Sequence, residues 1–122
     1  MSNIYTPTIK KARKEFCISI LNDIIEPMRH IARINGYALA VHGSLSRDID
    51  LIAIPWVEHA ETAGFLANEL CDCLKAFFGS CCLQGEVGIK PHGRKAYSII
   101  LSNTNVWIDL SIMPCIEDIN DE

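Results

Sequence analysis

The chain has 122 residues, close to half of them apolar, and a formal net charge of -4 at pH 7. This length and composition predict one folded domain and exclude a disordered or fibrous protein. The negative charge disfavours a dedicated nucleic-acid binder, which usually has a strongly basic face. No apolar run reaches the roughly 18 residues of a membrane span, and the first ten residues do not resemble a signal peptide. We therefore expect a cytoplasmic protein with no membrane partner.

The first expected element is an amphipathic helix over residues 8–35. Its apolar side chains recur at steps of three and four residues, and they are Ile9, Ala12, Phe16, Ile20, Ile24, Met28, Ile31 and Ile34. Pro27 either kinks this helix or starts a second one, and Asn35 with Gly36 ends it as a C-cap. The basic run at residues 10–14 is expected to be a solvated face of the helix.

After this helix the pattern changes to strands and one further helix. The expected order is strands at 37–42 and 48–56, a helix at 58–78 ended by Gly79, and strands at 83–89, 95–101 and 106–113. Residues 90–93 are expected to form a loop, and residues 102–105 a hairpin turn. The predicted fold is α/β (α+β), a mixed sheet of about five strands with two main helices packed on one face. It forms a single domain over residues 1–122, with a core over about 8–114 and an acidic tail at 115–122.

The cysteine and tryptophan residues are expected to be packed in the core and to have no catalytic or metal-binding role. The six cysteines do not match the spacing of a zinc site, so we expect reduced thiols, several of them in the core. Trp56 and Trp107 are also expected in the core. The alternative for Trp107 is that it stacks on a base, because it shares a strand face with Asp109.

Three carboxylates gather on two of the expected strands. Strand alternation places Asp48 and Asp50 on the same face, and Asp109 interrupts an apolar run on the last strand. Like charges this close repel one another, so either one carboxylate takes a proton or a cation lies between them. Three carboxylates on one sheet are typical of a site for divalent metal, here Mg²⁺ or Mn²⁺. For Asp109 the alternatives are a salt bridge, to Arg47 or Arg94, and an edge position that faces water.

Gly43 and Ser44 stand between the first strand and the carboxylate pair. Glycine lets the backbone approach a phosphate closely, and a serine hydroxyl with exposed amides can bind phosphate oxygens. A Gly-Ser pair is more often a plain turn, but its place directly before Asp-x-Asp favours a phosphate-binding role.

These motifs together resemble the polymerase-beta-like nucleotidyltransferase superfamily. In that superfamily a Gly-Ser pair precedes Asp-x-Asp on the next strand, and a third carboxylate lies on a later strand. The matching segments here are Gly43-Ser44, Asp48-Ile49-Asp50-Leu51 and Trp107-Ile108-Asp109-Leu110. Across residues 36–114 the chain looks like small, phage-encoded minimal members of the superfamily.

The resemblance implies a metal-dependent nucleotidyltransferase. Such a protein moves a nucleoside monophosphate from an NTP to a hydroxyl acceptor on a protein, a small molecule or RNA. The implied metal and catalytic residues are Asp48, Asp50 and Asp109. The expected nucleotide- and phosphate-binding residues are Gly43, Ser44, Lys90, Arg94 and Lys95, of which the three cations are inferred from their charge and not from a family motif.

Two other functions remain open at this point. Only three residues separate Gly-Ser from Asp-x-Asp, whereas family members have a longer connection that includes a short helix. The pattern of these 122 residues also does not predict the additional helical domain that usually recognises base and acceptor. The alternative is therefore a catalytically inactive module of the same fold that binds a nucleotide or a regulatory partner, either a second protein or another copy of the chain. A third hypothesis is a metal-dependent phosphoester hydrolase assisted by His42 or His92.

Overall fold

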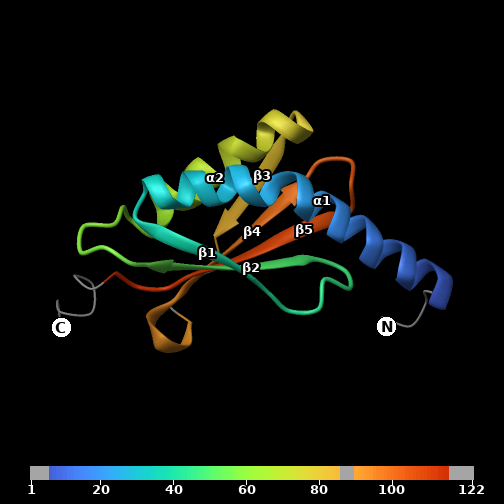
Figure 1. Cartoon of the computed structure of the whole chain (residues 1–122), viewed down its shortest axis with the longest axis horizontal. Coiled ribbons are helices and arrows are strands. Elements are labelled where there is room, and N and C mark those ends of the chain that lie inside the picture. The colour runs from blue at the N-terminus through green and yellow to red at the C-terminus, as the bar shows by residue number, and fades with distance from the viewer. Residues whose placement is uncertain (1–5, 86–89, 116–122) are drawn as a thin grey trace.

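The computed structural model describes residues 6–85 and 90–115, and the description below concerns those ranges. The elements in chain order are α1 (Pro7–Ile34), β1 (Tyr37–His42), β2 (Ile49–Pro55), α2 (Ala63–Phe78), β3 (Cys81–Gly85), the short turn η2 (Pro91–Gly93), β4 (Lys95–Leu101) and β5 (Val106–Ile112). The strands form one mixed sheet in the order β1-β2-β5-β4-β3. Strands β2 and β5 run parallel, and the other three pairings are antiparallel. Both helices cover the same face of the sheet, which confirms the predicted α+β architecture (Figure 1).

Helix α1 runs without interruption through Pro27. It begins where the Thr6 hydroxyl accepts a hydrogen bond from the Ile9 amide at 3.2 Å, as an N-cap residue does. Pro27 has no amide hydrogen for the carbonyl of Asp23, but Asp23 is exposed, so solvent can hydrogen bond that carbonyl. The helix ends as predicted, with Asn35 as the C-cap and Gly36 at a φ of +91°.

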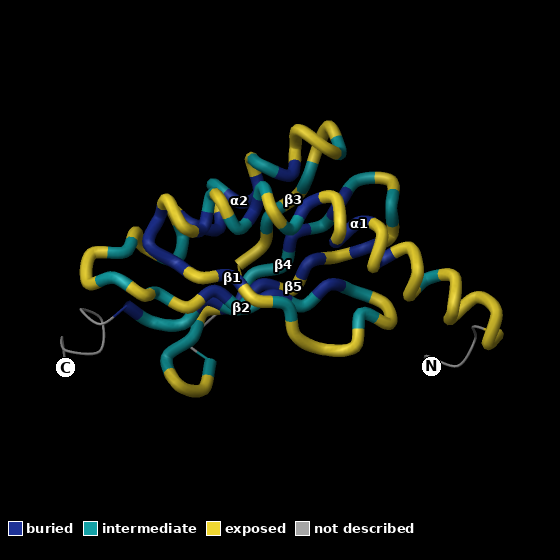
Figure 2. The backbone as a smooth tube through the Cα atoms, in the orientation of Figure 1, coloured by how far each residue is buried: buried dark blue, intermediate teal, exposed yellow. Residues whose placement is uncertain are grey.

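The buried stripe of α1 is confirmed in its middle and wrong at its ends. The buried residues are Cys17, Ile20, Leu21, Ile24, Met28 and Ala32. Ile9 and Phe16 are 44% and 45% exposed, because the first turns of α1 extend beyond the end of the sheet (Figure 2). We call this projecting segment, residues 7–16, the arm of α1. Ile34, at the other end of the helix, is also exposed.

Two predicted boundaries need correction. Helix α2 begins at Ala63 and not at residue 58, because the Thr62 hydroxyl caps it through the Phe65 amide at 3.2 Å. The amide of Glu61 donates instead to the Asn35 carbonyl at 3.0 Å, which holds the preceding segment outside the helix. Strand β3 begins two residues earlier than predicted, at Cys81, and the rest of that prediction, residues 86–89, lies outside the described residues.

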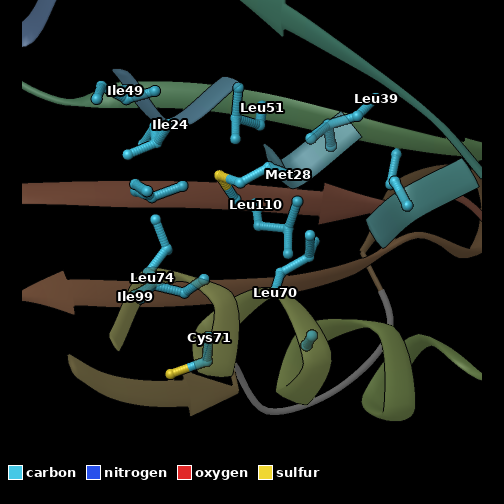
Figure 3. Close-up of a cluster of buried hydrophobic side chains, with 14 of the residues drawn as sticks. Ile24, Met28, Leu39, Ile49, Leu51, Leu70, Cys71, Leu74, Ile99 and Leu110 are labelled. Carbon is cyan, nitrogen blue, oxygen red and sulfur yellow. The ribbon is translucent and has the colours of Figure 1, made fainter. Parts of the chain in front are cut away.

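The core lies between the helices and the sheet. Side chains of α1 and α2 meet those of β2, β5 and β4 there, as Ile24, Leu74, Leu51, Leu110 and Ile99 illustrate (Figure 3). Cys115 also belongs to this core, and its thiol lies 3.3 Å from the Tyr37 hydroxyl. The cysteines are free thiols, as predicted. Among the described residues, neither helix combines the length and apolarity needed to cross a bilayer.

Candidate carboxylate site on the open face of the sheet

Two of the predicted aspartates, Asp50 and Asp109, lie on the face of the sheet that the helices leave open, and Asp48 lies in the bend directly before β2 and not on the strand as predicted. In β2, Ile49 and Leu51 are fully buried beneath the helices, and Asp50 between them therefore points the other way. In β5, Ile108 and Leu110 are buried in the same manner, and Asp109 is exposed. The alternation read from the sequence is confirmed on both strands.

The strand register brings Asp50 and Asp109 together. They are direct partners across the parallel pair β2–β5, where neighbouring strands lie about 4.8 Å apart. The same register continues to both edges of the sheet and creates one row of polar side chains across all five strands. This polar row consists of His42, Asp50, Asp109, Ser98 and Gln84. Two carboxylates therefore occupy the centre of an otherwise neutral or weakly basic row.

The electrostatic surroundings of Asp109 disfavour its charged form. Partial burial is the main cause that raises its pKa, and the nearby carboxylates of Asp48 and Asp50 raise it further. The Ser98 hydroxyl, which donates to Asp109 Oδ1 at 3.4 Å, opposes this change and lowers the pKa. Asp109 thus lies where a positive charge would be stabilised.

Asp48 lies at the same end of β2 but makes a different contact. Its Oδ1 accepts a hydrogen bond from the Trp107 amide at 3.3 Å. Within residues 6–85 and 90–115, no three side chains of His, Cys, Asp or Glu converge in an arrangement that could hold a metal ion. The aspartates are consequently an adjacent pair with a third carboxylate directed towards β5, and not a closed triad.

Gly43 lies directly against the Asp50 carboxylate. A Cβ atom at this position would collide with Asp50 Oδ2, and the backbone has a φ of +82°. Both observations explain a glycine here, because a side chain would displace Asp50 and strain the backbone. The Ser44 hydroxyl accepts a hydrogen bond from the Ser46 amide at 3.3 Å, within the short connection between β1 and β2.

The three predicted cationic residues lie near η2, but they do not share one face of the sheet. Arg94 reaches along the open face, where its Nη1 donates to the Ser111 hydroxyl at 3.1 Å. Ser111 is two residues beyond Asp109 on the same strand face. Lys95 pairs with Ile112, whose side chain belongs to the opposite, helix-covered face. Lys90 donates its amide to the Arg94 carbonyl at 2.9 Å, and so closes the loop.

Two side chains at the site were not predicted to be there. The sequence predicts the strand that contains Ser98 but assigns no functional residue to it. The alternation of β4 does place Ser98 on the open face. Arg13, expected on a solvated face, is partly buried, and its Nη2 donates to the carbonyls of Arg47 at 3.0 Å and Asn105 at 2.8 Å. Its position four residues before the buried Cys17 was the available signal, since residues four apart share a helix face.

The prediction that both tryptophans are core residues is wrong. Trp56 is 62% exposed and Trp107 is 43% exposed. Trp56 follows the last residue of β2, and Trp107 lies on the open face of β5, where the described residues place no covering helix or strand. Trp107 is therefore available to contact a ligand.

The charge of Asp109 is expected to make the metal-free chain less stable as the pH rises. Because its pKa is raised above the ordinary 3.8, the folded state binds this proton more tightly than the unfolded state. The free energy of unfolding should therefore decrease as the pH rises from about 3.8, the ordinary pKa, through the raised pKa of Asp109 in the folded state. Asp109→Asn should be more stable than wild type near neutrality by about 0.2–1 kcal/mol, the size found for exposed charge pairs. Urea unfolding with a chelator across this range checks it, and a constant difference at every pH would contradict it.

Comparisons with known proteins leave the family open. No protein-family model matches the chain, and a search of curated proteins finds no match. Among solved structures, the fold is similar to Cid1 poly(U) polymerase bound to MgGTP, with a TM-score of 0.42 and 15% sequence identity. The similarity covers 81% of this chain but 37% of that one, so the chain spans little more than a third of that polymerase. A likeness at this level shows no shared activity.

Proposed function

We propose that this protein is a metal-dependent nucleotidyltransferase. It would transfer a nucleoside monophosphate from an NTP to a hydroxyl group, forming a phosphoester bond to the hydroxyl oxygen and releasing pyrophosphate. The observation that carries the proposal is the pairing of Asp50 with Asp109 on adjacent central strands, with Gly43 packed against the Asp50 carboxylate. This arrangement joins the two halves of the sequence motif, which lie more than fifty residues apart. Asp50 and Asp109 lie on the face that the helices do not cover, so a substrate could reach them.

The donor set fits a divalent cation. Asp50 and Asp109 supply carboxylate oxygens, the ligands that Mg²⁺ and Mn²⁺ prefer, and a cation would relieve the repulsion among Asp48, Asp50 and Asp109. Asp48 would complete the set only if its carboxylate joined the pair, because no three such side chains converge among the described residues. A bound Mg²⁺ or Mn²⁺ would neutralise charge on the triphosphate and lower the pKa of the acceptor hydroxyl.

The other residues would bind and orient the nucleotide. Gly43 packs directly against the Asp50 carboxylate, so its backbone would lie beside a phosphate bound there, and Ser44 follows it with a hydroxyl at the surface. Arg94 holds its guanidinium on the same face through Ser111, where it can balance phosphate charge. We keep Lys90 as a candidate phosphate contact. Lys95 lies in register with the covered face, and its part in phosphate binding rests on its charge alone.

A catalytically inactive nucleotide-binding or partner-binding module is the second candidate. Two contacts favour it: the Asp48 carboxylate is engaged by the Trp107 amide, and the Ser44 hydroxyl is engaged by the Ser46 amide. Each contact uses part of the hydrogen-bonding capacity of its group, although the second Asp48 oxygen and the Ser44 O–H are not used by these two bonds. The partner in this case would be a second protein or another copy of the chain.

Thermal unfolding with each of the four NTPs, with and without Mg²⁺, tests the proposal. A ligand at 100 times its Kd stabilises a protein by about 2.7 kcal/mol, which raises the Tm of a domain of this size by about 8 °C or more. We expect one NTP to stabilise the chain only when Mg²⁺ is present. Absence of any such shift would contradict a nucleotide site. Binding without transfer of an α-phosphate label to any acceptor would favour the inactive module.

A further inference from the structure

A pocket opens beside the carboxylate site, at the end of the sheet from which the arm of α1 projects. Its volume is about 460 Å³, and it is lined by Arg13, Arg47, Asp48, Asn105 and Trp107. This volume is within the range of roughly 300–1,000 Å³ that is usual for ligand sites. Asp48 belongs both to this pocket and to the carboxylate site, so a ligand in the pocket would end next to the reacting groups.

Arg13 joins the arm of α1 to the two loops that border this pocket. One guanidinium nitrogen contacts the carbonyl of Arg47 in the β1–β2 loop and that of Asn105 in the β4–β5 loop. The Cys17 thiol donates to the same Arg47 carbonyl at 3.3 Å. Arg13 thus holds the backbone of both loops against α1, at Arg47 and at the residue before β5.

The arm carries further positive charge on the helix turns that flank Arg13, which itself lines the pocket. The arm contains four basic side chains and one carboxylate, Glu15, which pairs with Lys11, so its charge is opposite in sign to the net charge of the chain. At 100° per residue, Lys10 and Lys14 lie within about 100° of Arg13 around the helix, on the side of Arg13 and Cys17. We call Lys10, Lys14 and Arg47 the basic rim.

Trp107 supplies a flat apolar surface between the basic rim and the carboxylates. The residue is 43% exposed, and its backbone amide donates to Asp48, which holds this part of β5 beside the carboxylate site. An exposed aromatic ring beside several cations is the combination that binds single-stranded nucleic acid, because bases stack on the ring while cations contact the phosphates.

We propose that this pocket binds the end of a single-stranded nucleic acid, which serves as the hydroxyl acceptor. The terminal base stacks on Trp107, the basic rim contacts the phosphates before it, and the terminal hydroxyl lies towards Asp109. This assignment of the acceptor rests on the proposed nucleotidyltransferase function. The binding of the strand itself requires no NTP, and it can be measured separately.

Fluorescence anisotropy with a labelled, mixed-sequence 12-nucleotide RNA tests the proposal without NTP or metal. We expect Trp107→Ala to weaken binding by at least about fivefold, and Trp107→Phe to retain it, because any aromatic ring offers a stacking face. The double variant Lys10→Gln/Lys14→Gln should make the dependence of log K on log salt less steep. The magnitude of the negative slope should decrease by about 1.4, that is about 0.7 for each lost phosphate contact. Thermal unfolding of each variant verifies that it is folded.

The matched variant carries Arg33→Gln and Lys75→Gln. Both residues are exposed and neither lines the pocket, Arg33 lying about 28 Å from Lys14 along α1, and the change in net charge is identical. Equal loss of RNA affinity in both double variants, or unchanged affinity in Trp107→Ala, would overturn the proposed site. An NTP-dependent Tm shift with no RNA binding would overturn only the nucleic-acid acceptor. RNA binding with no Tm shift by any NTP would retain the pocket and contradict the transferase.

Discussion

The Asp50→Asn variant is expected to keep its fold and lose Mg²⁺-dependent NTP binding by at least about a hundredfold. Partners that merely orient metal ligands are worth about 10–100-fold, and Asp50 is proposed to be a ligand itself. At an NTP concentration that is 100 times the wild-type Kd, stabilisation should fall from about 2.7 to about 0.4 kcal/mol. Asparagine has nearly the shape of aspartate, so the contact with Gly43 remains and the loss reports the missing charge.

Asp72→Asn provides the matched comparison for this variant. Asp72 is an exposed carboxylate on α2 that pairs with Lys75 at 3.2 Å, and exposed pairs contribute little to stability. We expect this variant to be stabilised by NTP and Mg²⁺ as much as wild type. Thermal unfolding of the three proteins, with and without ligand, makes the measurement. Asp50→Asn that is stabilised as strongly as wild type would exclude Asp50 from the nucleotide site.

Much of the candidate site could be predicted from the sequence because strand alternation is a local property. Side chains two apart on a strand share a face, so Asp50 was assigned to the face opposite Ile49 and Leu51 without knowledge of the fold. The same reasoning placed Asp109 opposite Ile108. That the two aspartates are direct partners follows only from the register of the parallel pair β2–β5, which α2, β3 and β4 separate in the chain.

The burial of other residues near the site could not be predicted, because it depends on how far the helices extend over the sheet. The periodic pattern of α1 does not reveal where the sheet beneath it ends, so Phe16 and Arg13 were assigned to the wrong surroundings. The exposure of Trp107 has the same origin, because an aromatic residue on a strand is buried only if another layer covers that face. In the described residues the helices lie on one face alone.

The largest loss of stability is expected from Ile108→Ala, directly behind the carboxylates. Ile108 is fully buried, and its strand partners Ile49 and Ile99 are fully buried as well. Truncation would leave a cavity between the sheet and the helices, and such changes cost about 2–5 kcal/mol. We expect the Tm to fall by at least about 8 °C, measured by thermal unfolding of the ligand-free chain.

Ile54→Ala separates burial from strand propensity in this comparison. Ile54 lies on β2, so the change removes the same atoms from a strand, but its side chain is 46% exposed on the open face. Its truncation should cost less than about 1 kcal/mol, because little apolar surface returns to water and no cavity forms. Similar losses for the two variants would mean that something covers the open face in solution. A large loss for Ile108→Ala alone would show that the layer behind Asp50 and Asp109 carries the stability, while the face that bears them is free to bind a substrate.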